Sequence, residues 1–308
     1  MEEESPITRT FNQFTYPRLR LNDHTLDENL PGFQPRHEND RFHARPITSI
    51  GLDLRTLLDF RYVNRRAADL VSSLPQYKRI TTYAHNALRG ILSIGTGRWI
   101  TCAALYEKLC TPLCEQCSDF GGYLYLLTCQ RVCFLCLSQN TLYLPLPLRR
   151  ASRKFGVPRQ AVERLPCMKI IPGIYSPNEK KVARSTLVDY EAALRAGVAR
   201  HGSLEAMLRY VSNAEVIRNA SAIGRLSGRP PASDPFDGCS GNPFRFVAIT
   251  RIPWLNRASQ EVEWGFHCIG CEKSSRVPLH YRRQFTKALF DIHLRQSGDI
   301  QNGKHQLG

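Results

Sequence analysis

Two pairs of cysteines in the middle of the chain have the spacing of a metal site. Cys114 and Cys117 form one Cys-x2-Cys pair, and Cys133 and Cys136 form a second pair after fifteen intervening residues. Each such turn places two thiolates on one side of the backbone, and two turns close a tetrahedron with metal–sulfur distances of about 2.3 Å. Four thiolates leave no open position for water. We therefore expect a structural zinc site rather than a catalytic one.

Two further cysteines lie close to this cluster in the sequence. They are Cys110 and Cys129, and either can replace one of the four ligands. A lone cysteine is more often a buried free thiol than a ligand. The alternative for the whole cluster is that all six cysteines are unligated.

A second, weaker metal pattern lies near the C-terminus. Cys268 and Cys271 follow an expected strand, and His293 lies on an expected helix twenty-one residues further on. Strand, cysteine turn and helical histidine are arranged as in a zinc finger. The fourth ligand is expected near Ser297, but serine is a poor ligand for zinc. Three histidines can take its place: His305, His280 or His267. A metal-free fold held by aromatic residues is the alternative.

The elements that must position these residues are mainly helical. Apolar residues recur at helical spacing over 52–72, with a break at Asn64, and again over 80–91. A short helix over 100–108 leads into the cysteines, and 123–127 is expected as a strand between the two pairs.

Further helices and strands are expected in the second half of the chain. Helices are predicted over 185–200, capped by Ser185 or Thr186, from Ser203 onwards, and over 281–296. Alternating apolar residues predict strands over 244–249 and 261–266.

These patterns predict an α+β fold, mainly helical, with small zinc-held strand elements. The expected organisation follows in chain order: a disordered N-terminal tail at 1–47, a short helical segment at 48–78, a helical region at 79–223 with the cysteine cluster at 110–136, a linker at 224–243, and a C-terminal Cys/His element at 244–308.

The composition narrows the class of protein. No run of about eighteen apolar residues occurs, so we expect no membrane span. The acidic start lacks the apolar stretch of a secretory signal, which predicts cytoplasm or nucleus, where thiols stay reduced. The 308 residues carry a net charge of +15, which favours an acidic partner such as nucleic acid or an acidic protein surface. The alternative is that these scattered positive residues lie on solvated outer faces of helices. The densest basic stretch lies over 149–164.

Motifs of catalysis are missing from the sequence. The chain has no Gly-rich phosphate loop, no G-x-S-x-G elbow and no H-E-x-x-H helix. We therefore expect a protein that is not an enzyme.

Several segments resemble a family of fungal F-box proteins. The stretch LDLRTLLDFRYVNRRA at 52–67, followed by Leu74-Pro-Gln-Tyr, looks like the second half of an F-box. The cysteine cluster, the segment LPCMKIIPGIYS at 165–176 and the WGFHC motif at 264–268 are similar to the downstream part of such proteins. The resemblance covers roughly residues 52–305. It departs from the family in two places: the first F-box helix is not recognisable before Leu52, and Ser297 stands where the family tends to place a cysteine.

The resemblance implies a role in ubiquitin conjugation. An F-box docks on the Skp-type adaptor of a cullin ubiquitin ligase, and the rest of the chain recruits an as yet unknown protein substrate. The matching apolar residues would form the docking surface and the small helical core: Leu54, Leu57, Leu58, Phe60, Val63 and Ala67. The alternatives are a basic zinc-containing nucleic-acid-binding protein and a structural zinc protein without a ligase role.

Overall fold

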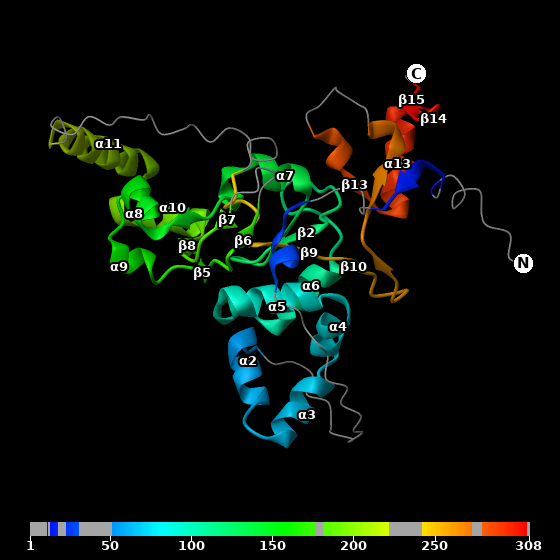
Figure 1. Ribbon diagram of the computed structural model, residues 1–308, viewed down its shortest axis with the longest axis horizontal. Coiled ribbons are helices and arrows are strands. Elements are labelled where there is room, and N and C mark those ends of the chain that lie inside the picture. The colour runs from blue at the N-terminus through cyan, green and yellow to red at the C-terminus, as the bar shows by residue number, and fades with distance from the viewer. Residues whose placement is uncertain are drawn as a thin grey trace, which may run out of the picture.

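The computed structural model describes residues 11, 13–17, 23–30, 51–175, 181–221, 242–272 and 279–306. The fold is mixed α+β, mainly helical, with several small sheets, as the sequence predicted. Figure 1 shows a helical arm at the bottom, a lobe that ends in α11 (Leu204–Ser221) at the left, and the C-terminal elements at the upper right. Each of these regions has apolar residues buried in it, and the largest core runs from the arm into the central sheet.

The arm consists of five consecutive helices. They are α2 (Leu54–Arg61), α3 (Arg65–Ser73), α4 (Pro75–Tyr83), α5 (His85–Ile94) and α6 (Cys102–Cys110). The expected break at Asn64 is present because its side chain accepts the Ala67 N–H at 2.8 Å and caps α3. Asp53 caps α2 in the same way. Gly95 ends α5 in the left-handed conformation, with φ +81°.

A three-stranded antiparallel sheet forms the centre of the molecule. Its strand order is β3 (Gln130–Val132), β2 (Tyr123–Tyr125) and β9 (Ile249–Arg251). The expected strand at 123–127 is therefore present, and α7 (Phe134–Gln139) follows the β2–β3 hairpin. The strand expected over 244–249 begins only at Ile249. The residues before Ile249 form turns, and Phe246, Val247 and Ala248 are all buried, so their alternation with polar residues does not mark a solvent face.

The lobe beside this sheet has its own small core. Its strands are β4 (Leu146–Pro147), β5 (Cys167–Lys169) and β8 (Thr186–Val188), and its helices are α8 (Leu148–Phe155), α9 (Arg159–Val162), α10 (Tyr190–His201) and α11. Nearby lie β6 (Gly173–Ile174) and β7 (Lys181–Val182), which pair with each other.

The helix predicted over 185–200 starts later than expected. Residues Thr186–Val188 are strand β8, and Leu187 pairs with Met168 of β5. Asp189 caps α10 instead of Ser185 or Thr186, since its Oδ2 accepts the Ala192 N–H at 2.8 Å. The β-branched Thr186 and Val188 favour the strand, and the sheet partner that selects it is remote in sequence. Ser203 caps α11 as expected, through the Ala206 N–H at 3.1 Å.

The C-terminal element combines short strands with one helix. Its parts are β10 (Trp254–Leu255), β11 (Val262–Glu263), β12 (Phe266–Cys268), β13 (Gln284–Phe285), α13 (Lys287–Ser297), β14 (Ile300–Gln301) and β15 (Lys304–His305). The single strand predicted over 261–266 is divided in two. Gly265 has φ +76°, which breaks the extended backbone between β11 and β12.

Our expectation of a disordered N-terminal tail was wrong for the residues that the structure describes there. Strand β1 (Thr15–Tyr16) pairs with β12, and Leu26 is fully buried in the main core. Asp23 accepts hydrogen bonds from Tyr123 at 2.6 Å and Arg282 at 2.7 Å. These contacts are all remote in sequence, so local periodicity gives no sign of them. The rest of 1–47, and residues 224–241 of the expected linker, lie outside the described residues.

Five short 3-10 helices complete the described structure. They are η2 (Leu26–Asn29), η3 (Gly97–Trp99), η4 (Thr141–Tyr143), η5 (Ile269–Cys271) and η6 (His280–Arg282). In the part of the chain described here, no helix has both the length and the apolar character needed to cross a membrane.

Candidate metal centres

The first cluster is built by a loop and a helix start that the β2–β3 hairpin brings together. Cys114 and Cys117 lie in the loop after α6, which is closed by the Cys114 N–H donating to Asp119 O at 2.6 Å. Cys133 is the N-cap residue of α7, and Cys136 lies in the first turn of that helix. The hairpin therefore returns the second pair to the first.

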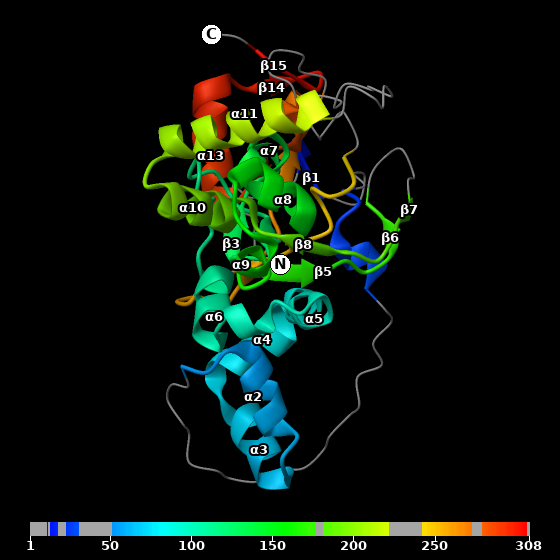
Figure 2. The ribbon, with the colours of Figure 1, turned by 90° about the vertical axis from the view of Figure 1, so that its left-hand side faces the viewer.

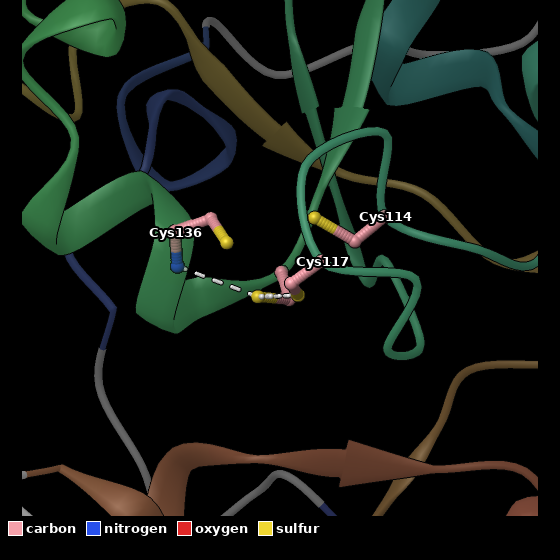
Figure 3. A group of neighbouring side chains, drawn as sticks. Cys114, Cys117 and Cys136 are labelled. Carbon is pink, nitrogen blue, oxygen red and sulfur yellow. Dashed lines mark hydrogen bonds between the residues drawn. The ribbon is translucent and has the colours of Figure 1, made fainter.

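The four sulfur atoms lie at the separations of a tetrahedral site. All lie within 4.8 Å of one another, and the Cys117 and Cys133 sulfurs are 3.6 Å apart. Around an ion bonded to sulfur at about 2.3 Å, neighbouring sulfurs are about 3.8 Å apart. Figure 3 shows the sulfur atoms of Cys114, Cys117 and Cys136 directed into the space between the loop and the helix. These residues fit a metal ion with four thiolate ligands.

Backbone groups stabilise negative charge on these sulfurs. The Gln116 N–H donates to Cys114 Sγ at 3.5 Å, and the Cys136 N–H donates to Cys133 Sγ at 3.4 Å. A hydrogen bond from Cys133 lowers the pKa of the Cys114 thiol to about 5, and the same contact raises the pKa of Cys133. Burial raises the pKa of Cys136 to about 12. A bound cation would replace these protons and compensate the thiolate charges.

The two alternative ligands of the first cluster lie outside it. Among the described residues, neither Cys110 nor Cys129 belongs to the group of sulfurs. Cys129 lies in the turn of the β2–β3 hairpin with φ +56°. Burial raises the pKa of its thiol to about 12, which keeps it protonated. Both cysteines are free thiols in this structure.

The second cluster unites two cysteines and two histidines. Cys268 ends β12, Cys271 lies in η5, His293 lies on α13 and His305 lies on β15. His305 Nε2 lies 3.3 Å from Cys268 Sγ and 3.4 Å from Cys271 Sγ. His293 Nε2 lies 3.4 Å from Cys271 Sγ and 3.2 Å from His305 Nε2. A tetrahedral ion with sulfur at about 2.3 Å and nitrogen at about 2.0 Å requires separations of about 3.3–3.8 Å, so these atoms fit one.

The structure selects one of the three histidines considered for the fourth position. His305 joins the cluster because the β14–β15 hairpin folds back over η5. His267 points elsewhere: its Nδ1 lies 3.2 Å from Tyr281 O, and its ring stacks on Tyr16. His280 is also outside the group of ligand atoms.

Ser297 has a place in this centre although it is not among the ligand atoms. Its Oγ lies 3.2 Å from His293 Nδ1, and Gly298 O lies 2.8 Å from His305 Nδ1. With Nε2 of each ring directed into the cluster, each Nδ1 carries the proton and donates these hydrogen bonds. Phe285 stacks on His293, with ring centroids 4.4 Å apart. Contacts of this kind fix the ring orientation of ligating histidines.

The six residues expected to dock on an adaptor divide between interior and surface. Leu54, Leu57 and Ala67 are buried in the arm, so they are core residues and do not form a docking surface. Leu58 is partly buried against the main core. Phe60 and Val63 are exposed, at 38% and 67%. Helix α2 packs against α3 and η3, which buries the first group.

Sequence reasoning missed two surface residues of the same region. Tyr62 is 79% exposed and Leu52 is 37% exposed, and both flank α2. Tyr62 continues the helical spacing of Leu54 and Leu58, so the sequence pattern alone does not show that its side chain faces solvent. Figures 1 and 2 both show α2 and α3 at the opposite end of the molecule from β14 and β15.

Comparisons with protein-family models, with curated proteins and with solved structures gave no match.

Proposed function

We propose that this chain is a non-catalytic adaptor, in which two structural zinc ions hold the body and the α2–α3 hairpin docks on a partner. The partner that the F-box resemblance implies is the Skp-type adaptor of a cullin ubiquitin ligase. The rest of the chain would then recruit the protein to be ubiquitinated. One observation carries this proposal: three large apolar side chains at the α2–α3 turn, Phe60, Tyr62 and Val63, are exposed.

Three large apolar residues lie at the α2–α3 turn, and a fourth, Leu52, precedes α2. Leu52, Phe60, Tyr62 and Val63 are 37%, 38%, 79% and 67% exposed. Large apolar residues that gather at one exposed place are typical of protein-binding surfaces. Their neighbours Leu54 and Leu57 are fully buried, so the hairpin is anchored on one side and presents apolar groups on the other.

The ligand sets support zinc and a structural role. Four thiolates in one centre, and two thiolates with two imidazoles in the other, are sets that favour tetrahedral zinc. When bound, zinc would supply cross-links between segments that are remote in sequence. Cys114, Cys117, Cys133 and Cys136 would hold one ion, and Cys268, Cys271, His293 and His305 the other. Neither set leaves a position for a substrate or an activated water.

The test of docking is a calorimetric titration of the full chain with a purified Skp-type adaptor. We expect a one-to-one complex that Tyr62→Ser and Val63→Ser each weaken about tenfold or more, since each removes an exposed apolar contact. Leu208→Ser is the matched control, because Leu208 is 52% exposed on α11, outside the arm. No binding by a folded, zinc-loaded chain, or equal loss in the control, would refute the proposal.

The basic face of α8 favours a second candidate, nucleic-acid binding. Arg149, Arg150 and Arg153 are exposed on this helix. Three glutamates of the same lobe already pair with other arginines four residues away: Glu163 with Arg159, Glu191 with Arg195, and Glu205 with Arg209. The α8 cations therefore form an electropositive surface suited to phosphates.

Salt dependence distinguishes this candidate from the adaptor role. Phosphate contacts release counterions. The affinity for a short DNA or RNA duplex should therefore fall about 10³-fold or more when the salt concentration rises from about 50 to about 200 mM. Replacing Arg149 and Arg150 by glutamine should reduce the slope. Binding that is absent at low salt excludes this candidate and leaves adaptor docking untouched.

A further inference from the structure

A cavity lies where the N-terminal segment, the central sheet and the C-terminal element meet. Its volume is about 300 Å³, and its walls include Pro17, Gly122, Arg251, Glu263, Trp264 and Gln284. That volume is at the lower end of the range of about 300–1,000 Å³ found for ligand sites. It is suited to one long side chain rather than to a nucleotide or a large cofactor. Neither metal centre contributes a ligand residue to its lining.

Gln284 gives this cavity an unpaired polar group. The residue is 4% exposed, and its Oε1 has no hydrogen-bond partner, while its Nε2 donates to Trp264 O at 3.4 Å. A buried acceptor without a partner has lost its hydrogen bond to water without replacement, which destabilises the fold. Such a group is retained where a ligand can supply the missing donor, so Gln284 points to a ligand with N–H groups.

Glycine backbones keep the wall of the cavity open. A Cβ on Gly122 would lie 2.0 Å from Gln284 Oε1, so no larger residue fits there without displacing the glutamine. Gly265, with φ +76°, would bring a Cβ within 2.5 Å of the Phe120 ring. The two glycines let the central sheet and the β11–β12 connection approach each other around the cavity.

An aromatic residue and an acidic residue, Trp264 and Glu263, both line the cavity. Trp264 is 49% exposed, which is unusual for the largest apolar side chain. Glu263 precedes it, and its Oε2 accepts the Lys287 N–H at the start of α13 at 3.3 Å. This hydrogen bond holds the carboxylate at the start of α13. Because the aromatic ring and the carboxylate line the same cavity, both favour a cation in it.

Arg251, which lines the cavity, has its positive charge paired with a carboxylate of the protein itself. Its guanidinium lies 3.5 Å from the Asp27 carboxylate, and its backbone N–H donates to the same oxygen at 2.7 Å. Asp27 is almost fully buried, so this pair contributes little net charge to the cavity. The charge that remains for a ligand is the negative charge of Glu263.

We propose that this cavity binds a lysine or arginine side chain of a partner peptide. The methylene stem packs on the Trp264 ring, the charged end pairs with Glu263, and an N–H group donates to Gln284 Oε1. This inference rests on the proposed adaptor function, for which it names the class of substrate: proteins with an exposed basic segment.

The test is calorimetric titration of the full zinc-loaded chain, without the Skp-type adaptor, with three blocked pentapeptides. They have lysine, norleucine or glutamate at the centre of four alanines. We expect the lysine peptide to bind at least about tenfold more tightly than the norleucine peptide, since only lysine offers a charge-assisted hydrogen bond. The glutamate peptide should not bind. Equal binding of the lysine and norleucine peptides, tighter binding of glutamate, or no binding of any would overturn the proposal.

A matched pair of variants tests whether Glu263 supplies the negative charge that binds the lysine. Glu263→Gln should weaken lysine binding about tenfold, by removing the paired charge. Glu261→Gln removes the same charge two residues away, from an exposed side chain outside the cavity lining, and should leave binding unchanged. Trp264→Ala should abolish binding, with zinc content and melting temperature showing that the variant is folded. Equal effects of the two glutamine variants would contradict the site.

These experiments distinguish failure of the peptide site from failure of docking on the Skp-type adaptor. A chain that binds the Skp-type adaptor but not the lysine peptide loses only the peptide site. A chain that binds the lysine peptide but not the Skp-type adaptor keeps the site and loses the ligase role.

Discussion

Asp119 Oδ1 accepts a hydrogen bond from Arg283 Nη2 at 2.5 Å, although 164 residues separate the two in sequence. Asp119 closes the loop of the first cysteine pair, where its carbonyl accepts the Cys114 N–H. The Arg283 guanidinium lies over the Phe285 ring, and Phe285 stacks on His293 of the second centre. A continuous series of contacts therefore joins the two candidate metal centres.

This ion pair should couple the two halves of the molecule measurably but weakly. Both side chains are partly exposed, at 30% for Arg283 and 23% for Asp119, so solvent screens the attraction. In a double-mutant cycle with Asp119→Asn and Arg283→Gln, we expect a coupling energy of about 0.5–1 kcal/mol that falls with added salt. Strictly additive effects of the two substitutions on the free energy of unfolding would show that the ion pair does not stabilise the fold.

Cysteine replacements should separate ligands from free thiols. Cys133→Ser removes one ligand of the first centre, and because structural zinc contributes on the order of 10 kcal/mol, the middle region should unfold and lose that ion. Cys129→Ser is the matched control, since Cys129 is equally buried but lies outside the cluster. It should keep both ions. Zinc content and thermal melts measure the difference, and similar melting of Cys133→Ser and the parent would rule out a structural site.

Ser297→Ala should weaken the second centre alone. The variant removes the acceptor of the hydrogen bond that His293 Nδ1 donates, so the ring is free to rotate, and losing such a contact to a ligating histidine costs about 10–100-fold in metal affinity. Competition with a chromophoric chelator measures both ions in one experiment. The first centre, in the same chain, is the internal control. Unchanged affinity at the second centre would mean that Ser297 does not position the histidine.

Arg131 should be sensitive to replacement by methionine. It is fully buried on β3, where Nη1 donates to Lys108 O at 2.8 Å and to Pro253 O at 2.9 Å, and Nη2 donates to Ile252 O at 3.3 Å. Arg131→Met leaves these carbonyls without donors, so we expect a loss of about 3–5 kcal/mol in chemical denaturation.

The control for this change is Arg149→Met. Arg149 is exposed on α8, and its replacement should change stability by no more than about 0.5 kcal/mol. Equal stability of the two variants would mean that the carbonyl contacts of Arg131 do not stabilise the fold.

The sequence predicted those parts of the fold that depend on local spacing. The helices of the arm follow from apolar residues on one face, and the caps at Asn64 and Ser203 follow from residue type. The Cys-x2-Cys turns are local as well, so the four cysteines of the first cluster were identified together.

The parts that the sequence left open depend on remote partners. His305 joins Cys268 only because the β14–β15 hairpin folds back, and no spacing rule selects it over His267. Strand β8 was taken for a helix because its sheet partners β4 and β5 are remote in sequence. Strand β1 was missed because two residues have no period, and its partner β12 lies about 250 residues away.

Native mass spectrometry of the full chain, alone and then mixed with a Skp-type adaptor, is the most direct test of a zinc-held adaptor. We expect two zinc ions per chain and a one-to-one complex with the adaptor. A folded chain without zinc would contradict the metal-held body. A folded chain with both ions and no complex would contradict the adaptor role.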